Sequence, residues 1–376
     1  MSLSRRTLIA GAGITSLCLV GGAGFWRVSK LPMTASTPWA VEEKGPLDVR
    51  LNALRYAILA PNPHNRQPWL IRLDGTDGAT ISCDLAKRLP QTDPFDRQTM
   101  IGFGTFIELA RIAAAEQGAR LEIEPFPEGE PEPRLDARPI AKLRFVPDAD
   151  VPKDPLFASI IKRRTNREIY DPTRPVSATI ANKIGGDEQT TDALKIAAIR
   201  AVTVPAWTIE QETPRTFKES IDLMRIGAEE IDTNPDGLAL KGPKMEALKL
   251  LGLLNRDSMA DPSSTAFTTG LEMQKEICGS LPALMWIITQ NNRRIDQLEA
   301  GYRYVRANLR ATSLGLAMQP LSQSLQEFPE MAAQFAQIHD LLGGQPGKRI
   351  QMLARLGYAT PVDPAARWPL EKHLII

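Results

Sequence analysis

The sequence predicts an α+β fold, because strand-like alternation and helical spacing of apolar residues both occur along the chain. Residues 69–73 alternate apolar and polar side chains, a turn follows at Asp74-Gly75, and residues 81–85 offer a hairpin partner. Residues 100–117 carry a strong helical pattern that ends at Gly118, a residue suited to a helix C-terminus. Helices and locally paired strands are therefore expected in one chain.

The first part of the chain contains further elements of both kinds. Residues 47–59 are predicted as a helix, because Leu51, Leu54 and Ile58 recur at helical spacing. Prolines at positions 61, 63 and 68 then force an extended loop before the strand at 69. Residues 121–123 and 141–146 are predicted strands, separated by a proline-rich acidic loop.

The second part of the chain repeats this mixture. Helical patterns are predicted over residues 156–164, 176–184, 214–232, 243–255 and 299–316. Apolar runs that predict strands lie at residues 197–204, 283–289 and 351–358. Residues 259–270, rich in Ser, Thr and Pro, are predicted as a loop, and residues 318–322 as irregular.

The composition describes an ordinary globular chain of 376 residues, with 43% hydrophobic and 24% charged residues. That length allows roughly two domains, or one large one. The 45 basic and 44 acidic side chains nearly cancel, which argues against a nucleic-acid or polyanion binder. The three cysteines form no CxxC pair, and only three histidines occur. We therefore expect no zinc site, disulfide framework or other metal site.

Residues 1–31 resemble a twin-arginine (Tat) export signal. Arg5 and Arg6 precede an uncharged run, rich in Gly and Ala, that extends to Phe25. A buried helix rarely contains so many glycines, since each costs about 1 kcal/mol relative to Ala. An ordinary N-terminal anchor helix is the alternative, and both cleavage near residue 24 and retention as an anchor stay open. Residues 32–46 are predicted as a linker.

Two helices of the chain are similar to one another. Residues 101–118 can be laid on residues 300–315, since each segment has an early Gly, small residues in the middle and a closing Gly. An extended segment follows each of them. The pattern indicates an internal repeat, and chance similarity of two small-residue helices is the alternative.

The sharpest motif is the segment Ala60-Pro-Asn-Pro-His-Asn-Arg-Gln-Pro-Trp69. Its prolines stiffen a loop in which Asn65 and Gln67 each offer amide donors and an acceptor. Such a loop suits a planar heteroaromatic ligand with donors and acceptors along its edge. A rigid connector whose polar groups cap neighbouring elements explains the same residues equally well.

The second motif is the basic string Lys162-Arg-Arg-Thr-Asn-Arg167, predicted where a helix gives way to a loop. Several guanidinium groups beside a hydroxyl form a phosphate cradle, because Arg donates bidentately to phosphate oxygens. A solvated run of charges is the commoner meaning of such a string.

Together these motifs resemble the nitroreductase family of flavin enzymes. Members carry an Arg-Arg-Ser-x-Arg-like string, here at 163–167, and a Pro-Ser-x-x-Asn-x-Gln-Pro-Trp-like loop, here at 61–69. Also similar are a small-residue helix that leads into a Gly-Leu segment at 308–322, a Leu-Gly-Tyr strand at 356–358 and an Arg-x-Pro-Leu-Glu tail at 367–371. The resemblance covers most of residues 47–376.

The order of the motifs departs from that of an ordinary nitroreductase, whose chain is half as long and carries the Arg string before the loop. In that family FMN lies between two subunits, which contribute one motif each. Here each half of the chain keeps one motif, and residues 201–207 stand where a second loop is expected. This arrangement resembles the Acg family, whose flavin-binding members have a duplicated nitroreductase fold.

The resemblance therefore implies a fused pseudo-dimer with one complete flavin site. Its nitroreductase-like halves would be residues 47–150 and 151–376, each with a central mixed or antiparallel sheet flanked by helices. Residues 233–270 match no part of an ordinary nitroreductase. They are predicted either as a lid over the flavin or as a packing insertion on the surface.

The resemblance also implies which residues hold FMN. The phosphate would be bound by Arg163, Thr165 and Arg167 with help from Arg367, while Arg164 points either way. The ring and ribityl side would be lined by Pro61, Asn62, Pro63 and Asn65, with Gln67 bracing the loop and His64 nearby. The isoalloxazine edge would lie near Gln319, Pro320 and Leu321. No catalytic side chain is assigned, because the flavin carries the electrons.

The expected function is two-electron reduction of a small nitroaromatic or quinone-like acceptor through FMN, with NAD(P)H or another donor. The alternative is a non-catalytic protein that binds or sequesters FMN in an occluded site. The expected location is periplasmic, free or membrane-anchored, after passage through the Tat machinery. A monomeric pseudo-dimer is favoured over an obligate homodimer, and no nucleic-acid partner is expected.

Overall fold

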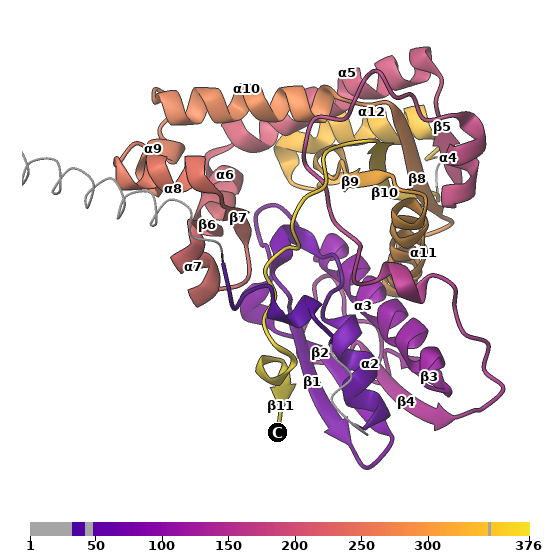
Figure 1. The fold of residues 1–376 in the computed structure, drawn as a ribbon. Coiled ribbons are helices and arrows are strands. Elements are labelled where there is room, and N and C mark those ends of the chain that lie inside the picture. The colour runs from indigo at the N-terminus through magenta and orange to yellow at the C-terminus, as the bar shows by residue number, and fades with distance from the viewer. Residues whose placement is uncertain (1–31, 42–47, 345–346) are drawn as a thin grey trace, which may run out of the picture.

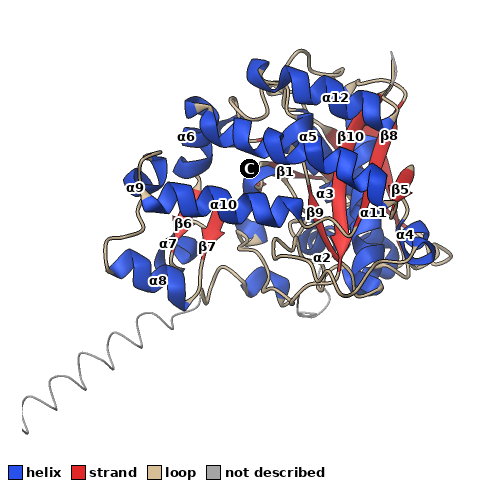
Figure 2. Ribbon diagram, turned by 90° about the horizontal axis from the view of Figure 1, so that it is seen from above, coloured by secondary structure: helices blue, strands red, loops and turns tan. Residues whose placement is uncertain are grey.

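The computed structural model describes residues 32–41, 48–344 and 347–376. The predicted export signal lies outside the described residues, as does the linker beyond residue 41. The chain has an α+β fold in which two principal sheets carry helices on their faces (Figures 1 and 2). Within the described ranges, no helix is both long enough and apolar enough to cross a membrane.

The first sheet has the strand order β11-β1-β2-β4-β3. Its strands are β1 (Trp69–Asp74), β2 (Gly78–Cys83), β3 (Ala119–Pro125), β4 (Ala141–Pro147) and β11 (Leu374–Ile375). All pairs are antiparallel except β1 with β11, in which Ile71 lies opposite Leu374. The predicted hairpin is present, and the C-terminal strand joins its outer side (Figure 1).

The second sheet has the order β5-β8-β10-β9 and is antiparallel throughout. Its strands are β5 (Glu188–Thr190), β8 (Ala283–Thr289), β9 (Ala317–Pro320) and β10 (Arg349–Gly357). The strands β8 and β10 are buried along almost their whole length, because apolar residues cover both faces of this sheet. That burial explains their continuous apolar sequences.

The two sheets share one topology. In the first sheet, a short helix precedes β1 and a long helix connects β2 to β3, which lies at the far end of the order β1-β2-β4-β3. In the second sheet, a short helix likewise precedes β5 and a long helix connects β8 to β9, at the far end of the order β5-β8-β10-β9. The short helices are α2 (Val49–Ala57) and α4 (Ala178–Ile184), and the long ones are α3 (Arg97–Glu116) and α11 (Arg294–Ser313). Only the second unit adds a helix between its last two strands in sequence, α12 (Ala332–Leu342).

The long helices α3 and α11 cross at two glycines. A Cβ atom on Gly104 would lie 2.1 Å from the carbonyl oxygen of Leu298, and one on Gly301 would lie 2.2 Å from that of Ile101. No side chain fits there, so the two backbones are in direct contact. The two segments predicted to resemble one another, residues 101–118 and 300–315, thus lie in helices that pack together. The glycine that faces Gly301 is Gly104, whereas the sequence comparison had placed Gly102 at the equivalent position.

In the second unit, which is built on the second sheet, a long insertion separates the strands β5 and β8 (Figure 1). At the same place the first unit has only the turn between β1 and β2. The helices of the insertion are α5 (Ala193–Glu212), α6 (Pro214–Asp222), α7 (Ala228–Thr233), α8 (Pro243–Leu250), α9 (Arg256–Ala260) and α10 (Thr265–Gly279). Two short parallel strands, β6 (Met224–Ile226) and β7 (Leu238–Leu240), form a third sheet within it. The segment predicted as a lid is therefore the central part of a larger insertion.

Several predicted elements were wrong. Residues 197–204, predicted as a strand, lie inside α5, where Ile196, Ile199 and Val202 are buried at helical spacing. β-branched residues gave a strand-like local pattern, but tertiary packing of one face and the N-cap Asp192 favour the helix. Residues 201–207 therefore occupy a helix and not the place of a second loop.

The predicted loop at 259–270 was also wrong, because α10 begins within it. Ser264 accepts a hydrogen bond from the backbone N–H of Phe267 and caps this helix, so a residue that suggested a loop marks a helix start. The helix predicted at 156–164 contains only the 3-10 turn Phe157–Ser159. The helix predicted at 214–232 is interrupted by β6.

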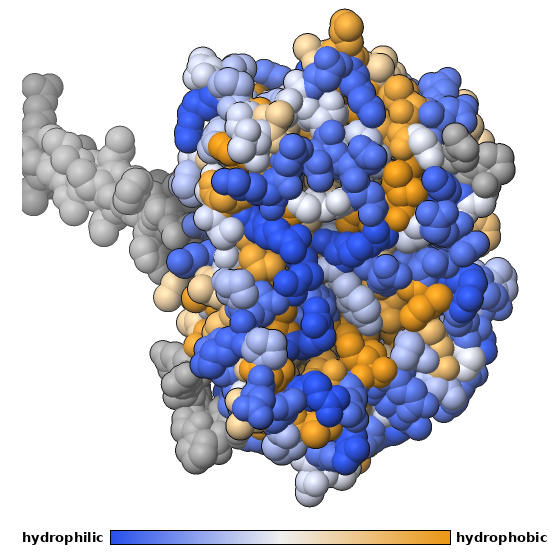
Figure 3. Space-filling model, turned by 90° about the vertical axis from the view of Figure 1, so that its right-hand side faces the viewer, coloured by the Kyte–Doolittle hydropathy of each residue, from blue (hydrophilic) through white to orange (hydrophobic). Residues whose placement is uncertain are grey.

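Hydrophobic residues on the face drawn in Figure 3 form separate patches between polar and charged residues. Scattered apolar residues are normal on a soluble surface. This face therefore presents no single large apolar area for a partner.

We predict that Gly301→Ala destabilises the protein by about 1–3 kcal/mol or more, because overpacking must push α3 and α11 apart. Gly270→Ala is the matched control, since this helical glycine on α10 has open space around it. The control should be neutral or stabilising by up to about 1 kcal/mol. Urea unfolding followed by circular dichroism measures both; equal stability of the two variants would contradict the close crossing.

Candidate functional site

The loop between α2 and β1 holds three non-glycine residues in left-handed backbone conformations. His64, Asn65 and Gln67 have φ values of 46°, 53° and 51°. Such conformations cost about 1 kcal/mol or more each and persist only where surrounding contacts impose them. The loop docks on α3, where Gly102 leaves room for Asn62 and the Thr105 hydroxyl donates to the Pro61 carbonyl at 2.7 Å.

Side-chain amides of the loop hold its shape from within. The Asn62 Oδ1 atom accepts from the Gln67 backbone N–H at 2.8 Å. Gln67 is fully buried; its Nε2 donates to the carbonyl of Pro235 at 2.8 Å, and its Oε1 accepts from the backbone N–H of Trp368 at 2.9 Å. These side chains therefore face protein groups, and the polar surface for a ligand must come from elsewhere.

Arg367 is the second brace of the loop. Its Nε donates to the Ile58 carbonyl at 3.0 Å, and its Nη2 donates to the carbonyls of Leu59 and Ala60 at 3.1 Å. Its Nη1 donates to Asn65 Oδ1 and to the Ala366 carbonyl. All its N–H groups thus have protein acceptors, so any contribution to phosphate binding would come through its positive charge.

The basic string lies beside this loop, with Arg163 buried and Arg167 accessible to water. The Arg163 Nη2 donates to the Leu59 carbonyl at 3.0 Å, while its Nε and Nη1 are buried without a partner in the described chain. Arg167 has no hydrogen bond or ion pair to any described residue. Burial lowers the pKa of Arg163 to about 10, and desolvation by surrounding protein also lowers the pKa of Arg167.

Arg167 is accessible to water, and desolvation by the protein around it still lowers its pKa. Arg163 and Arg167 have no carboxylate partner among the described residues. Two guanidinium groups of this kind favour binding of an anion.

Trp39 is a part of this cluster that the sequence did not indicate. Its ring lies 5.6 Å from the guanidinium carbon of Arg163, 4.8 Å from that of Arg164 and 5.3 Å from that of Arg367. These are cation–π distances. The described part of the predicted linker therefore packs on the site, and Arg164 is directed to this ring and to the carbonyls of Ile161 and Arg163.

Helix α11 contributes two further polar side chains, Tyr304 and Asn308, which lie one turn apart on one face. The Tyr304 hydroxyl and both polar atoms of the Asn308 amide are buried without a partner in the described chain. Arg163 and Arg167 both act on the pKa of Tyr304, which burial raises. An unsatisfied buried polar group costs about 1–3 kcal/mol, so this set fits a polar ligand. The sequence marked the helix as similar to the family but gave no role to these residues.

The remaining predicted residues lie on or beside β9. The backbone N–H of Asn166 donates to the Met318 carbonyl at 3.2 Å, which ties the basic string to this strand. Gln319 Oε1 accepts from Arg355 Nε at 2.8 Å, and Pro320 and Thr165 are half-buried. Leu321 packs in the core beside α5 and α12. Its side chain is therefore part of the core.

Arg355 is another residue that sequence reasoning missed. It is fully buried on β10, its guanidinium lies 3.7 Å from the ring centre of Tyr170, and it donates to the carbonyls of Glu168 and Ser280. It thus fixes the chain that follows the basic string. An isolated Arg within an apolar strand was the only sequence signal.

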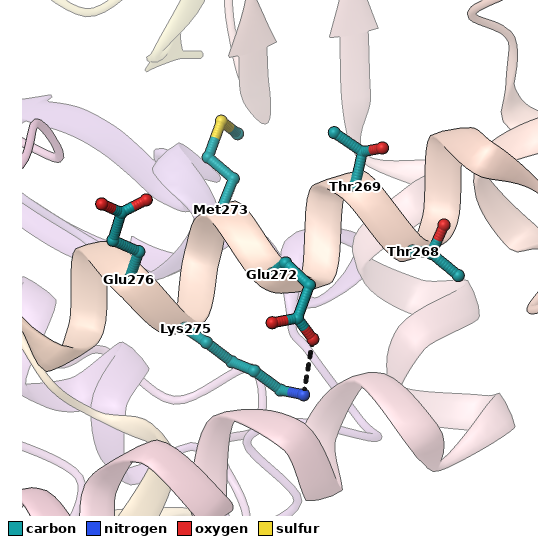
Figure 4. Close-up of a pocket in the computed structure, with 6 residues that line it drawn as sticks. All are labelled: Thr268, Thr269, Glu272, Met273, Lys275 and Glu276. Atoms are coloured by element: carbon teal, nitrogen blue, oxygen red, sulfur yellow. Dashed lines mark hydrogen bonds and ion pairs between the residues drawn. The ribbon is translucent and has the colours of Figure 1, made fainter.

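Figure 4 shows an open pocket whose lining comes from α10 alone: Thr268, Thr269, Glu272, Met273, Lys275 and Glu276. It contains none of the predicted site residues, and its one basic side chain, Lys275, pairs with Glu272 at 3.0 Å. No described group of three or more His, Cys, Asp or Glu side chains could hold a metal ion. The candidate site is therefore the region of the loop, the basic string and α11.

The chain is similar to proteins that carry nitroreductase names. It is 25% identical over 360 residues to "Putative NAD(P)H nitroreductase Rv3131" of Mycobacterium tuberculosis H37Rv, and equally to "Putative NAD(P)H nitroreductase MT3217" of strain CDC 1551. The matched region covers 89% of this chain and 95% of each relative. This similarity supports the predicted relationship to the nitroreductase family. No family model matches the chain.

Two solved structures with nitroreductase descriptions are also similar. One, from Anabaena variabilis, has 12% identity and a TM-score of 0.41, over 87% of this chain and 91% of that one. The other is the FMN and NADPH-dependent nitroreductase NfnB from Sphigopyxis sp. strain HMH. It has 17% identity and a TM-score of 0.32, over 57% of this chain and 93% of that one.

We predict that Gln67→Ala lowers the free energy of unfolding by about 2–3 kcal/mol. The change leaves the Trp368 N–H and the Pro235 carbonyl without their partner and puts Ala at a positive φ. Gln290→Ala, at an exposed position, should stay within about 0.5 kcal/mol of the parent. Chemical denaturation measures both, and a Gln67 variant as stable as the control would show that the loop does not depend on this brace.

Proposed function

We propose that this protein is an FMN-dependent oxidoreductase of nitroreductase type that reduces a small nitroaromatic or quinone-like acceptor by two electrons. The observation that carries the proposal is the pair Arg163 and Arg167, which have no carboxylate partner among the described residues and lie beside a loop held in a strained shape. The names of the two Mycobacterium tuberculosis relatives support NAD(P)H as the proposed donor.

The phosphate end of FMN fits the basic string. Nε and Nη1 of Arg163 and the guanidinium of Arg167 offer donors that no described protein group uses. A phosphate dianion would offset the mutual repulsion of the arginines, which contributes to the lowered pKa of Arg163 and of Arg367. Each charge-assisted hydrogen bond would contribute about 1.5–3 kcal/mol.

The polar edge of the ring and the ribityl chain fit the orphaned groups nearby. The Asn308 amide offers a donor and an acceptor, and the Tyr304 hydroxyl and the His64 imidazole each offer one of either kind. The braced loop would hold the flavin in one orientation. When bound, the flavin supplies the two-electron chemistry, and the protein's part is to bind it, orient it and limit access of water.

We further propose one flavin per chain and a monomeric pseudo-dimer. The shared topology of the two sheets supports a duplicated fold. Between α4 and β5, at the place equivalent to the loop 61–69, the chain has only Gly185, Gly186 and Asp187. This connection lacks amide side chains, so the second site would be incomplete.

A second candidate function is sequestration of FMN without turnover. The insertion contacts the flavin-site loop directly: Pro235 accepts from Gln67, Asp236 pairs with Arg66 at 3.1 Å, and the Gly237 N–H donates to the Asn65 carbonyl at 3.3 Å. A cover fixed in this way would restrict the entry of donors and acceptors. The export proposed below would support this candidate too, because NAD(P)H is expected to be scarce outside the cytoplasm.

Export through the Tat machinery to the periplasm is also a proposal, supported by Arg5, Arg6 and the uncharged run after them. Cell fractionation of the parent and of an Arg5→Lys, Arg6→Lys double variant tests it. Retention of only the variant in the cytoplasm supports export, and equal distribution of the two contradicts it.

We predict that Arg167→Ala weakens binding of FMN by about 10- to 100-fold and leaves binding of riboflavin nearly unchanged, because only FMN has the phosphate. Arg163→Ala should likewise weaken binding of FMN and leave binding of riboflavin nearly unchanged. Lys162→Ala is the matched control, since Lys162 is the exposed first residue of the same string. Quenching of flavin fluorescence measures the affinities. If the ratio of the affinity for FMN to that for riboflavin is unchanged in both arginine variants, the assignment of these residues to the phosphate is wrong.

We predict that the FMN-loaded protein loses its visible flavin absorption on anaerobic addition of NADPH and regains it on addition of a quinone. Loss of absorption with dithionite but not with NADPH or NADH would favour sequestration or another donor. A protein that takes up no FMN would overturn both candidates.

A further inference from the structure

Residues 33–40, here called the strap, precede α2 and lie against the insertion of the second unit (Figure 1). The carboxylate of Asp232 on α7 holds the start of the strap. The backbone N–H groups of Met33, Thr34 and Ala35 donate to it at 3.0, 3.0 and 2.9 Å, and so does the Thr34 hydroxyl at 3.0 Å. Although burial opposes the change, these hydrogen bonds hold the pKa of Asp232 below its ordinary value. One carboxylate thus clamps three successive residues.

The C-terminal tail holds the same segment. The backbone N–H of Arg367 donates to the Ala35 carbonyl at 2.8 Å. The Ala35 side chain packs with Ile231 of α7 and Ala366 of the tail in a small buried apolar cluster. The strap, the insertion and the tail therefore meet at one point, and the tail continues from there into the Arg367 side chain that braces the loop 61–69.

The strap leads from this point to the basic cluster. Trp39 Nε1 donates to the Ala365 carbonyl at 2.7 Å, which fixes the indole. The ring is only 7% exposed and lies within 5.6 Å of the guanidinium carbons of Arg163, Arg164 and Arg367. The face of an aromatic ring attracts cations most strongly where water is excluded. The ring therefore holds these guanidinium groups in place and shields them from water.

A phosphate group on this cluster and the docked strap would support one another. Nε and Nη1 of Arg163 have no partner in the described chain. A docked strap keeps water from the guanidinium groups, and the attraction between opposite charges grows as the surrounding dielectric constant falls. Coupling between two binding events is reciprocal. A strap that strengthens binding of the phosphate is therefore itself held more tightly when the phosphate is bound.

We propose that the strap closes the phosphate end of the ligand site, and that Trp39 and Asp232 are positioning residues for the phosphate group. The proposal rests on the proposed function. Trp39 acts through the arginine side chains, and Asp232 acts from a distance, through the strap. Docking of the strap strengthens binding of FMN, and release of FMN requires the strap to loosen.

Hydrogen exchange followed by mass spectrometry tests the coupling in the parent protein. The backbone amides of residues 33–35 should exchange slowly, because Asp232 accepts their hydrogen bonds. Saturating FMN should slow exchange of the strap by a further factor of about 5 or more. Riboflavin is the control, since it lacks the phosphate and should have little effect. Exchange of the strap that saturating FMN leaves unchanged overturns the proposal.

Quenching of flavin fluorescence gives the second readout. Trp39→Ala should weaken binding of FMN by about 5- to 30-fold and leave binding of riboflavin nearly unchanged. Trp39→Phe keeps an aromatic face and should restore most of the affinity for FMN. An equal loss of affinity for both flavins, or no loss for either, overturns the positioning role of Trp39.

Asp232 provides the test from a distance, because within the described chain its side chain has hydrogen bonds only to the strap. Asp232→Ala should speed exchange of residues 33–35 and weaken binding of FMN by about 3- to 30-fold. Glu229→Ala, at an exposed position of the same helix, is the matched control and should change neither. A strap that exchanges faster without any loss of affinity overturns the proposal, and so does unchanged exchange.

Failure of the proposed function gives a different result. If the parent protein binds no flavin, inorganic phosphate replaces FMN as the probe, with potassium chloride at equal ionic strength as its control. Slower exchange of the strap in phosphate supports the closure over a phosphate site. Equal exchange in the two salts overturns it.

Discussion

The direct contact of α3 and α11 at Gly104 and Gly301 determines where the groups of the candidate site lie. The loop 61–69 docks on α3 through Gly102 and Thr105, while Tyr304 and Asn308 belong to α11. The separation of the two helices therefore sets the distance between the loop and the polar side chains opposite. A close-packed interior changes little in volume, so a larger residue at the crossing would shift both sides of the site.

Around this crossing, buried arginines connect segments that are far apart in sequence. Arg367 in the C-terminal tail engages four backbone carbonyls and Asn65, and Arg355 engages the chain after the basic string. Their donors are satisfied by protein acceptors, which explains how buried charges are tolerated. Arg163 and Arg167 differ, because each keeps donors that no residue in the described part of the chain accepts. That difference separates the bracing arginines from those that would bind a ligand.

The insertion gives the second unit a role that the first unit lacks. It supplies Pro235 to Gln67 and Ser220 to His64, so it both supports and covers the loop. The same contacts are compatible with both proposed functions, the FMN-dependent enzyme and the FMN-sequestering protein. Movement of the insertion away from the loop would distinguish the enzyme from the sequestering protein, because in an enzyme a donor and an acceptor must reach the site in turn.

The sequence by itself determined the α+β class, the hairpin at 69–83, the long helices and the strands β8 and β10, because local periodicity and burial agree in these elements. It also marked the loop and the basic string as chemically unusual. It misplaced α5 and the start of α10, where packing and capping outweighed local composition. Only the tertiary structure decided that Trp39, Tyr304, Asn308 and Ser220 gather around these motifs, and that the amides of Asn62 and Gln67 face inward. Each of those outcomes depends on a contact between distant segments, for which one sequence carries no local signal.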